Sequence, residues 1–158
     1  IMRILVTGCA GFIGFHLINK ILKKNKEVIG IDNINNYYDH NLKKNRIKNL
    51  KKYKKFFFHK IDLCDYKKLN NLVKRNNINI IIHLAAQAGV RYSVKNPRAY
   101  FNSNLEGFFN ILEISRLNKI KHLIYASTSS VYGNSNKFPL NEIDRTDKPL
   151  SFYAATKK

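Results

Sequence analysis

The sequence has few cysteines and no long apolar run. Cys9 and Cys64 have neither the spacing of a metal site nor that of a disulfide framework. The apolar runs, such as residues 4–6 and 80–82, are far shorter than the roughly 20 residues that a spanning helix needs. The first apolar stretch runs directly into a glycine-rich motif, which is unlike a signal peptide. These features predict a cytoplasmic protein without a membrane span.

Acidic residues are also scarce, since 10 Asp and Glu stand against 29 Lys and Arg and give a formal net charge of +19. Such an excess is common in nucleic-acid-binding proteins, but no recognition motif accompanies it. The densest basic run, residues 43–55, has Leu42, Ile47 and Leu50 at roughly helical spacing, which predicts a solvated helix face over an apolar stripe. We therefore expect no specific nucleic-acid partner. We expect no metal either, because no ligand spacing relates the histidines His16, His40, His59, His83 and His122.

Strand-like and helix-like segments alternate along the chain, which is typical of a parallel sheet with crossover helices. The predicted strands are residues 3–7, 27–32, 55–61, 78–84 and 121–127. The predicted helices are residues 12–24, 39–52, 65–76 and 97–117, and a last helix capped by Ser151. In the first helix, Ile13, Leu17 and Ile21, with the adjacent Ile18 and Leu22, are expected on one buried face. We predict one α/β domain over residues 1–158, with a Rossmann-type doubly wound parallel sheet and helices on both faces.

Three glycines, Gly8, Gly11 and Gly14, occupy the first strand-to-helix turn. Glycine lets the backbone turn tightly and approach a pyrophosphate, and the helix N-terminus behind it offers free N–H groups. Asp32 ends the second predicted strand, where a carboxylate accepts hydrogen bonds from the ribose hydroxyls of NAD and repels the 2′-phosphate of NADP. The alternative is a plain tight turn followed by a surface aspartate. We predict an NAD site.

Other polar residues near strand ends have two possible roles each. Asp62 ends the third predicted strand, where it could contact the adenine of the cofactor. Alternatively, Asp62 or Asp65 caps the next helix, and both roles hold if Asp65 is the cap. Cys9 and His83 are interpreted as packing residues rather than as a nucleophile or an acid.

Several motifs, in this order, resemble the NAD-dependent epimerase/dehydratase family, which belongs to the extended short-chain dehydrogenases. They are Gly8-x-x-Gly11-x-x-Gly14, His83-Leu84-Ala85-Ala86, Asn104, Ser127-Thr128-Ser129-Ser130-Val131-Tyr132-Gly133 and Tyr153-x-x-x-Lys157. Within the family, segments 32–39 and 86–93 are similar to the UDP-glucuronate 4-epimerase branch. The glycine turn and this resemblance together predict cofactor contacts from Gly8, Gly11, Phe12, Ile13, Gly14, Asp32, Asn33, Asp62, Leu63, Leu84, Ala85, Ala86, Tyr153 and Lys157.

The chemistry of Tyr153 and Lys157 follows from their spacing. A tyrosine with an ordinary pKa of about 10 is a poor base at neutral pH. Lys157 lies one helical turn away on the same face, and its positive charge, with that of the nicotinamide ring, favours the phenolate. Thr128, at the end of the fifth predicted strand, can bond the reacting oxygen of a sugar. We predict that Tyr153 is the base, Lys157 its tuner and Thr128 their polar partner; the alternative is an ordinary exposed helix pair.

The residues after Thr128 separate the branches of the family. Dehydratases of this family typically carry Asp-Glu there, and decarboxylating relatives carry a Glu nearby, whereas this sequence has Ser129 and Ser130. The resemblance implies that these serines bond a sugar carboxylate and that Arg91 lies near the substrate; a surface ion pair is the alternative for Arg91. It also implies that Asn104 organises the site, with a plain surface role as the alternative. The predicted substrate-binding residues are Arg91, Thr128, Ser129, Ser130 and Tyr153.

The resemblance implies an NAD-dependent nucleotide-sugar 4-epimerase, with UDP-glucuronate as the favoured substrate and UDP-glucose as the alternative. It also implies a homodimer and further chain after residue 158, including the part that grips the nucleotide. We therefore expect residues 1–158 to be an N-terminal, C-terminally truncated portion that is inactive alone. An alternative of another class is a noncatalytic NAD-binding remnant.

Overall fold

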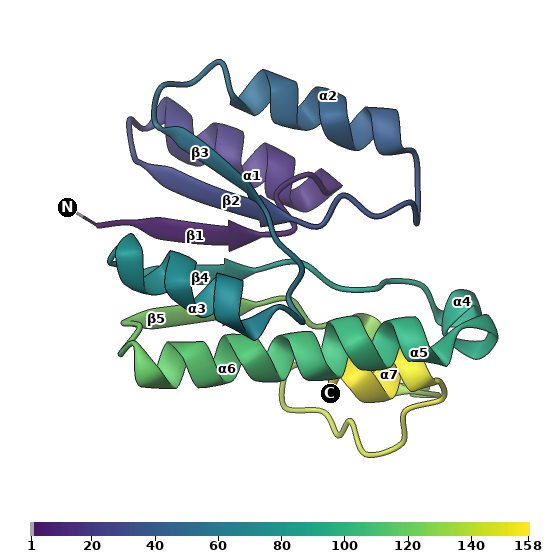
Figure 1. The fold of residues 1–158 in the computed structure, drawn as a ribbon. Helices are drawn as coiled ribbons and strands as arrows, with labels where there is room; N and C mark the ends of the chain where they lie inside the picture. Colours follow the sequence, from purple (N-terminus) through teal and green to yellow (C-terminus); the bar gives the residue numbers. More distant parts are fainter. Residues whose placement is uncertain (1) are drawn as a thin grey trace.

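The computed structural model describes residues 2–158, which form a five-stranded parallel sheet with helices on both faces (Figure 1). The order across the sheet is β3-β2-β1-β4-β5. The direction of winding therefore switches between β1 and β4, the place where doubly wound sheets bind ligands beyond their carboxyl ends. This confirms the predicted fold class. The strands are β1 (Ile4–Thr7), β2 (Val28–Asp32), β3 (Phe56–Lys60), β4 (Ile80–His83) and β5 (His122–Tyr125).

The helices follow the predicted alternation, with two additions that the sequence did not indicate. One is the short α4, and the other is a π-helical segment, Phe101–Glu106, which interrupts the long helix predicted over residues 97–117. A 3₁₀ turn, Ser129–Tyr132, follows β5. The α-helices are α1 (Phe12–Lys23), α2 (His40–Leu50), α3 (Tyr66–Arg75), α4 (Val90–Lys95), α5 (Pro97–Tyr100), α6 (Gly107–Leu117) and α7 (Phe152–Lys157).

The sheet is covered by a different pair of helices on each face (Figure 1). Alternate residues of a strand point to opposite faces, so Val6 packs under α1 and α2, and Leu5 packs under α3 and α6. Ile18 of α1 belongs to the first cluster, and Ile111 of α6 belongs to the second. Both faces of the central strands are therefore covered by helices.

The burial of α1 and α2 corrects three expectations. The buried face of α1 runs through Gly14, Ile18 and Leu22, which turns Ile13 outward, and Ile13 is 62% exposed. On α2, Leu42 is 42% exposed and does not join the apolar stripe. Lys43 is buried instead, so the basic run is not wholly a solvated face.

The edge of the sheet formed by β5 is open to solvent. Ile124 and Tyr125 of β5 are 45% and 54% exposed, and Phe109 on the neighbouring α6 is 62% exposed. Among residues 2–158, none of the helices combines the length and the apolar character needed to cross a membrane. Within the same residues, no cluster of acidic, histidine and cysteine side chains is arranged to hold a metal ion.

Candidate functional site

The site begins where β1 and β4 end side by side, since Thr7 is paired with His83 in the sheet register. The Thr7 hydroxyl accepts hydrogen bonds from the N–H groups of Leu84 and Ala85, at 3.1 and 3.0 Å, and lies 2.9 Å from Nδ1 of His83. Because the hydroxyl accepts two N–H groups, its own hydrogen is left for Nδ1. Burial, with the nearby charge of Lys157, lowers the pKa of His83 to about 3. His83 is therefore a neutral core residue that anchors the loop after β4.

The glycine turn lies against this loop. Gly8 has a φ of +69°, and a side chain there would place its Cβ 2.8 Å from the backbone nitrogen of Ala85, so only glycine fits. Gly11 donates its N–H to the carbonyl of Gly8 at 3.0 Å, which closes the turn. Cys9 is fully buried beside it and serves as a packing residue. The turn thus leads directly into the N-terminus of α1.

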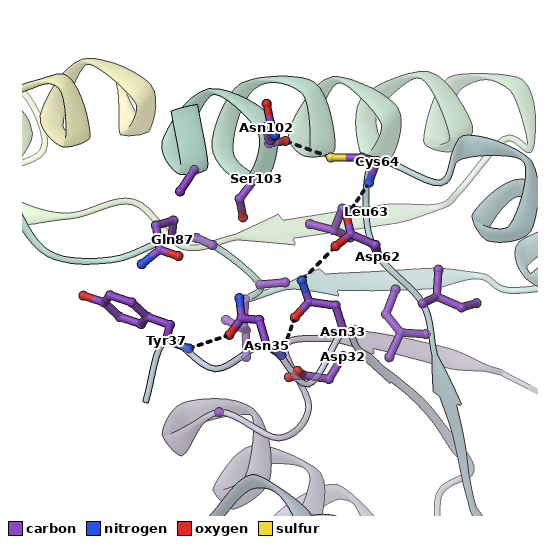
Figure 2. Close-up of a pocket in the computed structure, with 18 of the residues that line it drawn as sticks. Asp32, Asn33, Asn35, Tyr37, Asp62, Leu63, Cys64, Gln87, Asn102 and Ser103 are labelled. Carbon is purple, nitrogen blue, oxygen red and sulfur yellow. Dashed lines mark hydrogen bonds between the residues drawn. The ribbon is translucent and has the colours of Figure 1, made fainter. Parts of the chain in front are cut away.

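A cleft of about 440 Å³ opens beyond the carboxyl ends of β1, β2 and β4. In Figure 2, the loop after β2, the segment after β3, Gln87 and the π-helical segment surround it. The cleft collects most of the predicted cofactor residues. Those that line it are Gly8, Gly11, Asp32, Asn33, Asp62, Leu63, Leu84, Ala85 and Ala86.

Asp32 stands at the end of β2 with its carboxylate held from two sides. One oxygen accepts the N–H of Ala10 at 3.2 Å, and the other accepts the N–H of Ile34 at 2.8 Å. Ile34 has a φ of +53°, which is strained for a β-branched residue, and this hydrogen bond helps to hold it. The carboxylate is fixed at the mouth of the glycine turn, where the sequence predicts that it meets a ribose.

Asn33 and Asp62, both predicted to contact the cofactor, are bonded to each other. The Asn33 amide donates to the Asp62 carboxylate at 2.8 Å (Figure 2), and the N–H of Cys64 donates to its other oxygen at 2.9 Å. Burial raises the pKa of Asp62, but these hydrogen bonds lower it more, so the pKa lies below its ordinary value. Asp65 caps α3 by accepting the N–H of Lys68, which leaves Asp62 free to face the cleft.

The helix α7, which carries Tyr153 and Lys157, is tied to the cleft through Asn104. Ser151 caps the helix by accepting the N–H of Ala154 at 3.0 Å, as predicted. The amide of Asn104 accepts the N–H of Gln87 at 2.7 Å and donates to the Gln87 carbonyl and to the Thr156 hydroxyl, each at 3.0 Å. Asn104 is 3% exposed. It therefore joins the loop after β4 to the helix that carries Tyr153 and Lys157.

Lys157 lines a second cavity of about 220 Å³ that shares Ala85 and Ala86 with the cofactor cleft. Burial lowers the pKa of the Lys157 ammonium. The ring of Tyr153 packs edge-on against Tyr100, with ring centroids 5.9 Å apart. The two predicted catalytic residues thus stand together on α7, where Lys157 lines the second cavity and Tyr153 lines neither of the two.

The other predicted residues are less closely gathered. Thr128 caps the 3₁₀ turn, where its hydroxyl accepts the N–H of Ser130 at 3.3 Å and donates to the Ser130 hydroxyl at the same distance. Ser129 is exposed on this turn, and Arg91 is exposed on α4. The glycine turn carries the remaining three. They are the exposed Phe12 and Ile13, which do not line the cleft, and the buried Gly14.

Sequence reasoning missed several residues that line the cleft. The spacing of Lys43, Ile47 and Leu50 is that of one helix face, and this could have indicated that Lys43 is buried. No local pattern indicated the π-helical residues. The unpredicted lining residues include Asn35, Tyr37, Tyr38, Lys43, Gln87, Asn102 and Ser103.

The fold and the cleft are those of a Rossmann-type α/β protein with a Tyr-x-x-x-Lys helix beside the cleft. The sequence profile described as GDP-mannose 4,6 dehydratase matches residues 5–158. The chain therefore belongs to this family, which agrees with the resemblance seen in its motifs.

Curated relatives match almost the whole chain. Protein CapI of Staphylococcus aureus is 51% identical, covering 99% of this chain and 47% of its own length. The probable UDP-glucuronate 4-epimerase of Rhizobium meliloti is 46% identical, covering 99% of this chain and 46% of its own length. The chain thus spans about half the length of the curated relatives it matches.

Solved structures agree in fold. The UDP-glucuronic acid 4-epimerase of Bacillus cereus, in complex with UDP-glucuronic acid and NAD, is 37% identical with a TM-score of 0.88, covering 99% of this chain and 49% of that one. The UDP-Glc/GlcNAc 4-epimerase of Campylobacter jejuni is 28% identical with a TM-score of 0.90, covering 99% of this chain and 46% of that one.

Proposed function

We propose that this chain is the NAD-binding part of a nucleotide-sugar 4-epimerase whose substrate is UDP-glucuronate. The observation that carries the proposal is the path from Asp32 to Lys157, along which one cleft for a dinucleotide adjoins a cavity beside the catalytic helix. The similarity to UDP-glucuronate 4-epimerases, one of them solved with NAD, supports the same assignment.

The residues of the cleft suit NAD. Gly8 has a positive φ and lies close to Ala85, so no side chain fits at this position. A pyrophosphate can therefore approach the backbone of the turn. Asp32 offers a fixed carboxylate to the adenosine ribose, and Asp62 and Leu63 face the adenine end. NAD supplies a carbon that accepts hydride from the sugar and later returns it. The chain supplies binding, orientation and proton transfer.

Proton transfer falls to Tyr153. Its phenolate oxygen takes the proton of the C4 hydroxyl as hydride leaves C4, and returns it when hydride comes back to the opposite face of the rotated 4-keto sugar. The ammonium of Lys157, one turn away, favours the phenolate form. Thr128 orients the reacting oxygen. Ser129 and Ser130 accept and donate hydrogen bonds but are poor acids, so they favour neither elimination of water nor loss of carbon dioxide. This is why we propose an epimerase, although the family profile is described as a dehydratase.

The test uses the protein with its full chain. We expect UDP-glucuronate and UDP-galacturonate to interconvert without net consumption of NAD, as resolved by chromatography. A 4-keto-6-deoxy sugar or a pentose product would contradict the roles of Ser129 and Ser130. Turnover of neutral UDP-sugars only would instead support a UDP-glucose-type epimerase, which the similarity to the Campylobacter jejuni enzyme favours. NAD binding without any turnover would support the noncatalytic alternative.

The proposal includes a cytoplasmic homodimer. Apolar side chains that stay exposed follow one another along the π-helical segment and α6, namely Phe101, Leu105, Phe109 and Leu112, at 40–62% exposure. A second copy could cover them. We expect sedimentation at twice the mass of one chain, and a monomer for Phe109→Glu. A monomeric natural protein would contradict this part of the proposal.

A further inference from the structure

Lys43 is a buried lysine on α2, a helix whose other lysines are exposed. It lies one turn before Ile47 on the covered face of α2 and is 5% exposed. Its ammonium donates to the side-chain and backbone oxygens of Asn35, at 2.7 and 3.2 Å. It also lies 4.7 Å from the centre of the Tyr38 ring. Burying a lysine is costly unless its charge is compensated.

The compensating charge belongs to Asp32. The Lys43 nitrogen lies 3.8 Å from a carboxylate oxygen of Asp32, and both side chains are more than nine-tenths buried. Both also line the dinucleotide cleft, together with Asn35 and Tyr38. An ammonium has three N–H groups, of which Asn35 takes two. The third remains for Asp32 or for a ligand that reaches Asp32.

This pair changes the electrostatics of the place where the adenosine ribose lies. A lone carboxylate presents one negative charge to the 2′-position and repels a phosphate there. With Lys43 beside it, the net charge of the pair is close to zero, and weak screening in a buried site keeps both charges effective. Arg46 adds a second cation, since its guanidinium donates to Tyr38 and to the carbonyl of Ala10 at 3.2 and 3.1 Å.

We propose that Lys43 is a second determinant of cofactor choice, so that Asp32 alone prevents the Lys43 ammonium from binding the 2′-phosphate of NADP. This inference rests on the proposed function, because it assumes that the cleft binds a dinucleotide through the ribose at Asp32. The NAD preference of the natural protein then arises from a charged pair rather than from one carboxylate.

The measurement is the ratio of the dissociation constants of NADP and NAD, obtained by calorimetry on the full chain. Asp32→Asn removes the repelling charge at constant shape, and we expect the ratio to fall by on the order of a hundredfold. Lys43→Met keeps the length of the side chain without its charge, and we expect the ratio to rise by roughly tenfold. In the double variant, most of the gain in NADP binding should disappear. Lys44→Met, on the exposed side of α2, is the matched control and should leave the ratio unchanged.

If Lys43 has only a structural role, a different result is expected. If Lys43 only holds the loop through Asn35, Lys43→Met weakens NAD and NADP equally, and an unchanged ratio overturns the inference while NAD binding still supports the proposed function. Binding of neither dinucleotide by the natural protein overturns both. If Lys43→Met does not fold, as judged by circular dichroism, Lys43→Gln takes its place: a rise in the ratio supports the inference, and an unchanged ratio overturns it.

Discussion

At the scale of single residues, the polar groups of the site have hydrogen-bond partners that fix their orientation and protonation. His83 illustrates this, because the Thr7 hydroxyl bonds its Nδ1 and burial keeps its ring neutral. Its role as a packing residue could be inferred from its place at the end of an apolar strand. The tautomer of His83 could not be inferred from the sequence, because it depends on two N–H groups of the loop after β4 that donate to Thr7.

The lowered pKa of His83 predicts an acid-sensitive fold. The folded pKa is about 3 against an ordinary 6.5, so the unfolded chain binds the proton more readily. The contribution of His83 to stability is therefore complete above pH 6.5 and is lost progressively as the pH falls toward 3. We expect its ring ¹⁵N shifts to stay those of a neutral imidazole down to pH values at which the protein unfolds.

The variant His83→Gln provides the comparison. Its free energy of unfolding should depend less on pH below 6.5 than that of the natural protein. Protonation of the His83 ring near pH 6.5 while the protein is still folded would disprove the assignment.

At the scale of elements, the features that could be predicted from the sequence are those with a local sequence pattern. The alternation of strands and helices, the glycine turn at Gly8, and the caps Asp65 and Ser151 all have local signatures, and the structure confirms them. The π-helical segment has no such signature. It coincides with Asn104, whose bonds to Gln87 and Thr156 connect residues far apart in the chain. Lys43 was misjudged for a different reason: its spacing with Ile47 and Leu50 indicates the buried face, but the Asp32 charge that compensates its burial comes from another element.

Asn104 is expected to contribute both to stability and to the alignment of α7. Asn104→Ala leaves the N–H and carbonyl of Gln87 and the hydroxyl of Thr156 without this partner. An unsatisfied buried polar group costs about 1–3 kcal/mol, and we expect a loss of that order in urea unfolding. Asn102→Ala, at an exposed position of the same segment, is the control. Equal stability of both variants would show that the Asn104 bridge contributes nothing.

Two loops that flank the cleft are joined by Tyr37. Its hydroxyl donates to the carbonyl of Ala88 at 2.7 Å, and its ring lies 5.1 Å from that of Tyr92. The bond therefore connects the loop after β2 with the loop after β4 beside the cleft, which Tyr37 lines. A bound dinucleotide would leave more slowly while this connection holds.

Tyr37→Phe keeps the ring and removes the bond. We expect the rate of NAD dissociation to rise by about three- to tenfold, the equivalent of one hydrogen bond worth roughly 1 kcal/mol. Stopped-flow displacement of bound NAD measures this rate. Tyr66→Phe, on α3 and away from the cleft lining, is the matched control. An unchanged rate in Tyr37→Phe would mean that the two loops do not have to separate for release.

At the scale of the whole molecule, the dominant feature is the formal net charge of +19. Ion pairs such as Arg3–Glu27 and Lys68–Asp65 are partly exposed, and pairs of this kind contribute little to stability. Ten acidic residues are too few to neutralise the positive surface. Self-repulsion therefore opposes the compact state, whereas the buried Asp32–Lys43 pair is shielded from solvent.

Salt should consequently stabilise the protein. The screening length shortens from roughly 14 Å at about 0.05 M to roughly 4 Å at about 0.5 M ionic strength, which weakens repulsion across the surface more than attraction within close pairs. We expect the melting temperature to rise by roughly 5 °C over this range, or about 1–2 kcal/mol for a domain of this size. Chloride and acetate salts of equal ionic strength should act alike, because screening does not depend on the identity of the anion. A melting temperature that falls with salt would instead mean that surface ion pairs outweigh the repulsion, and a large difference between the two anions would point to specific anion binding.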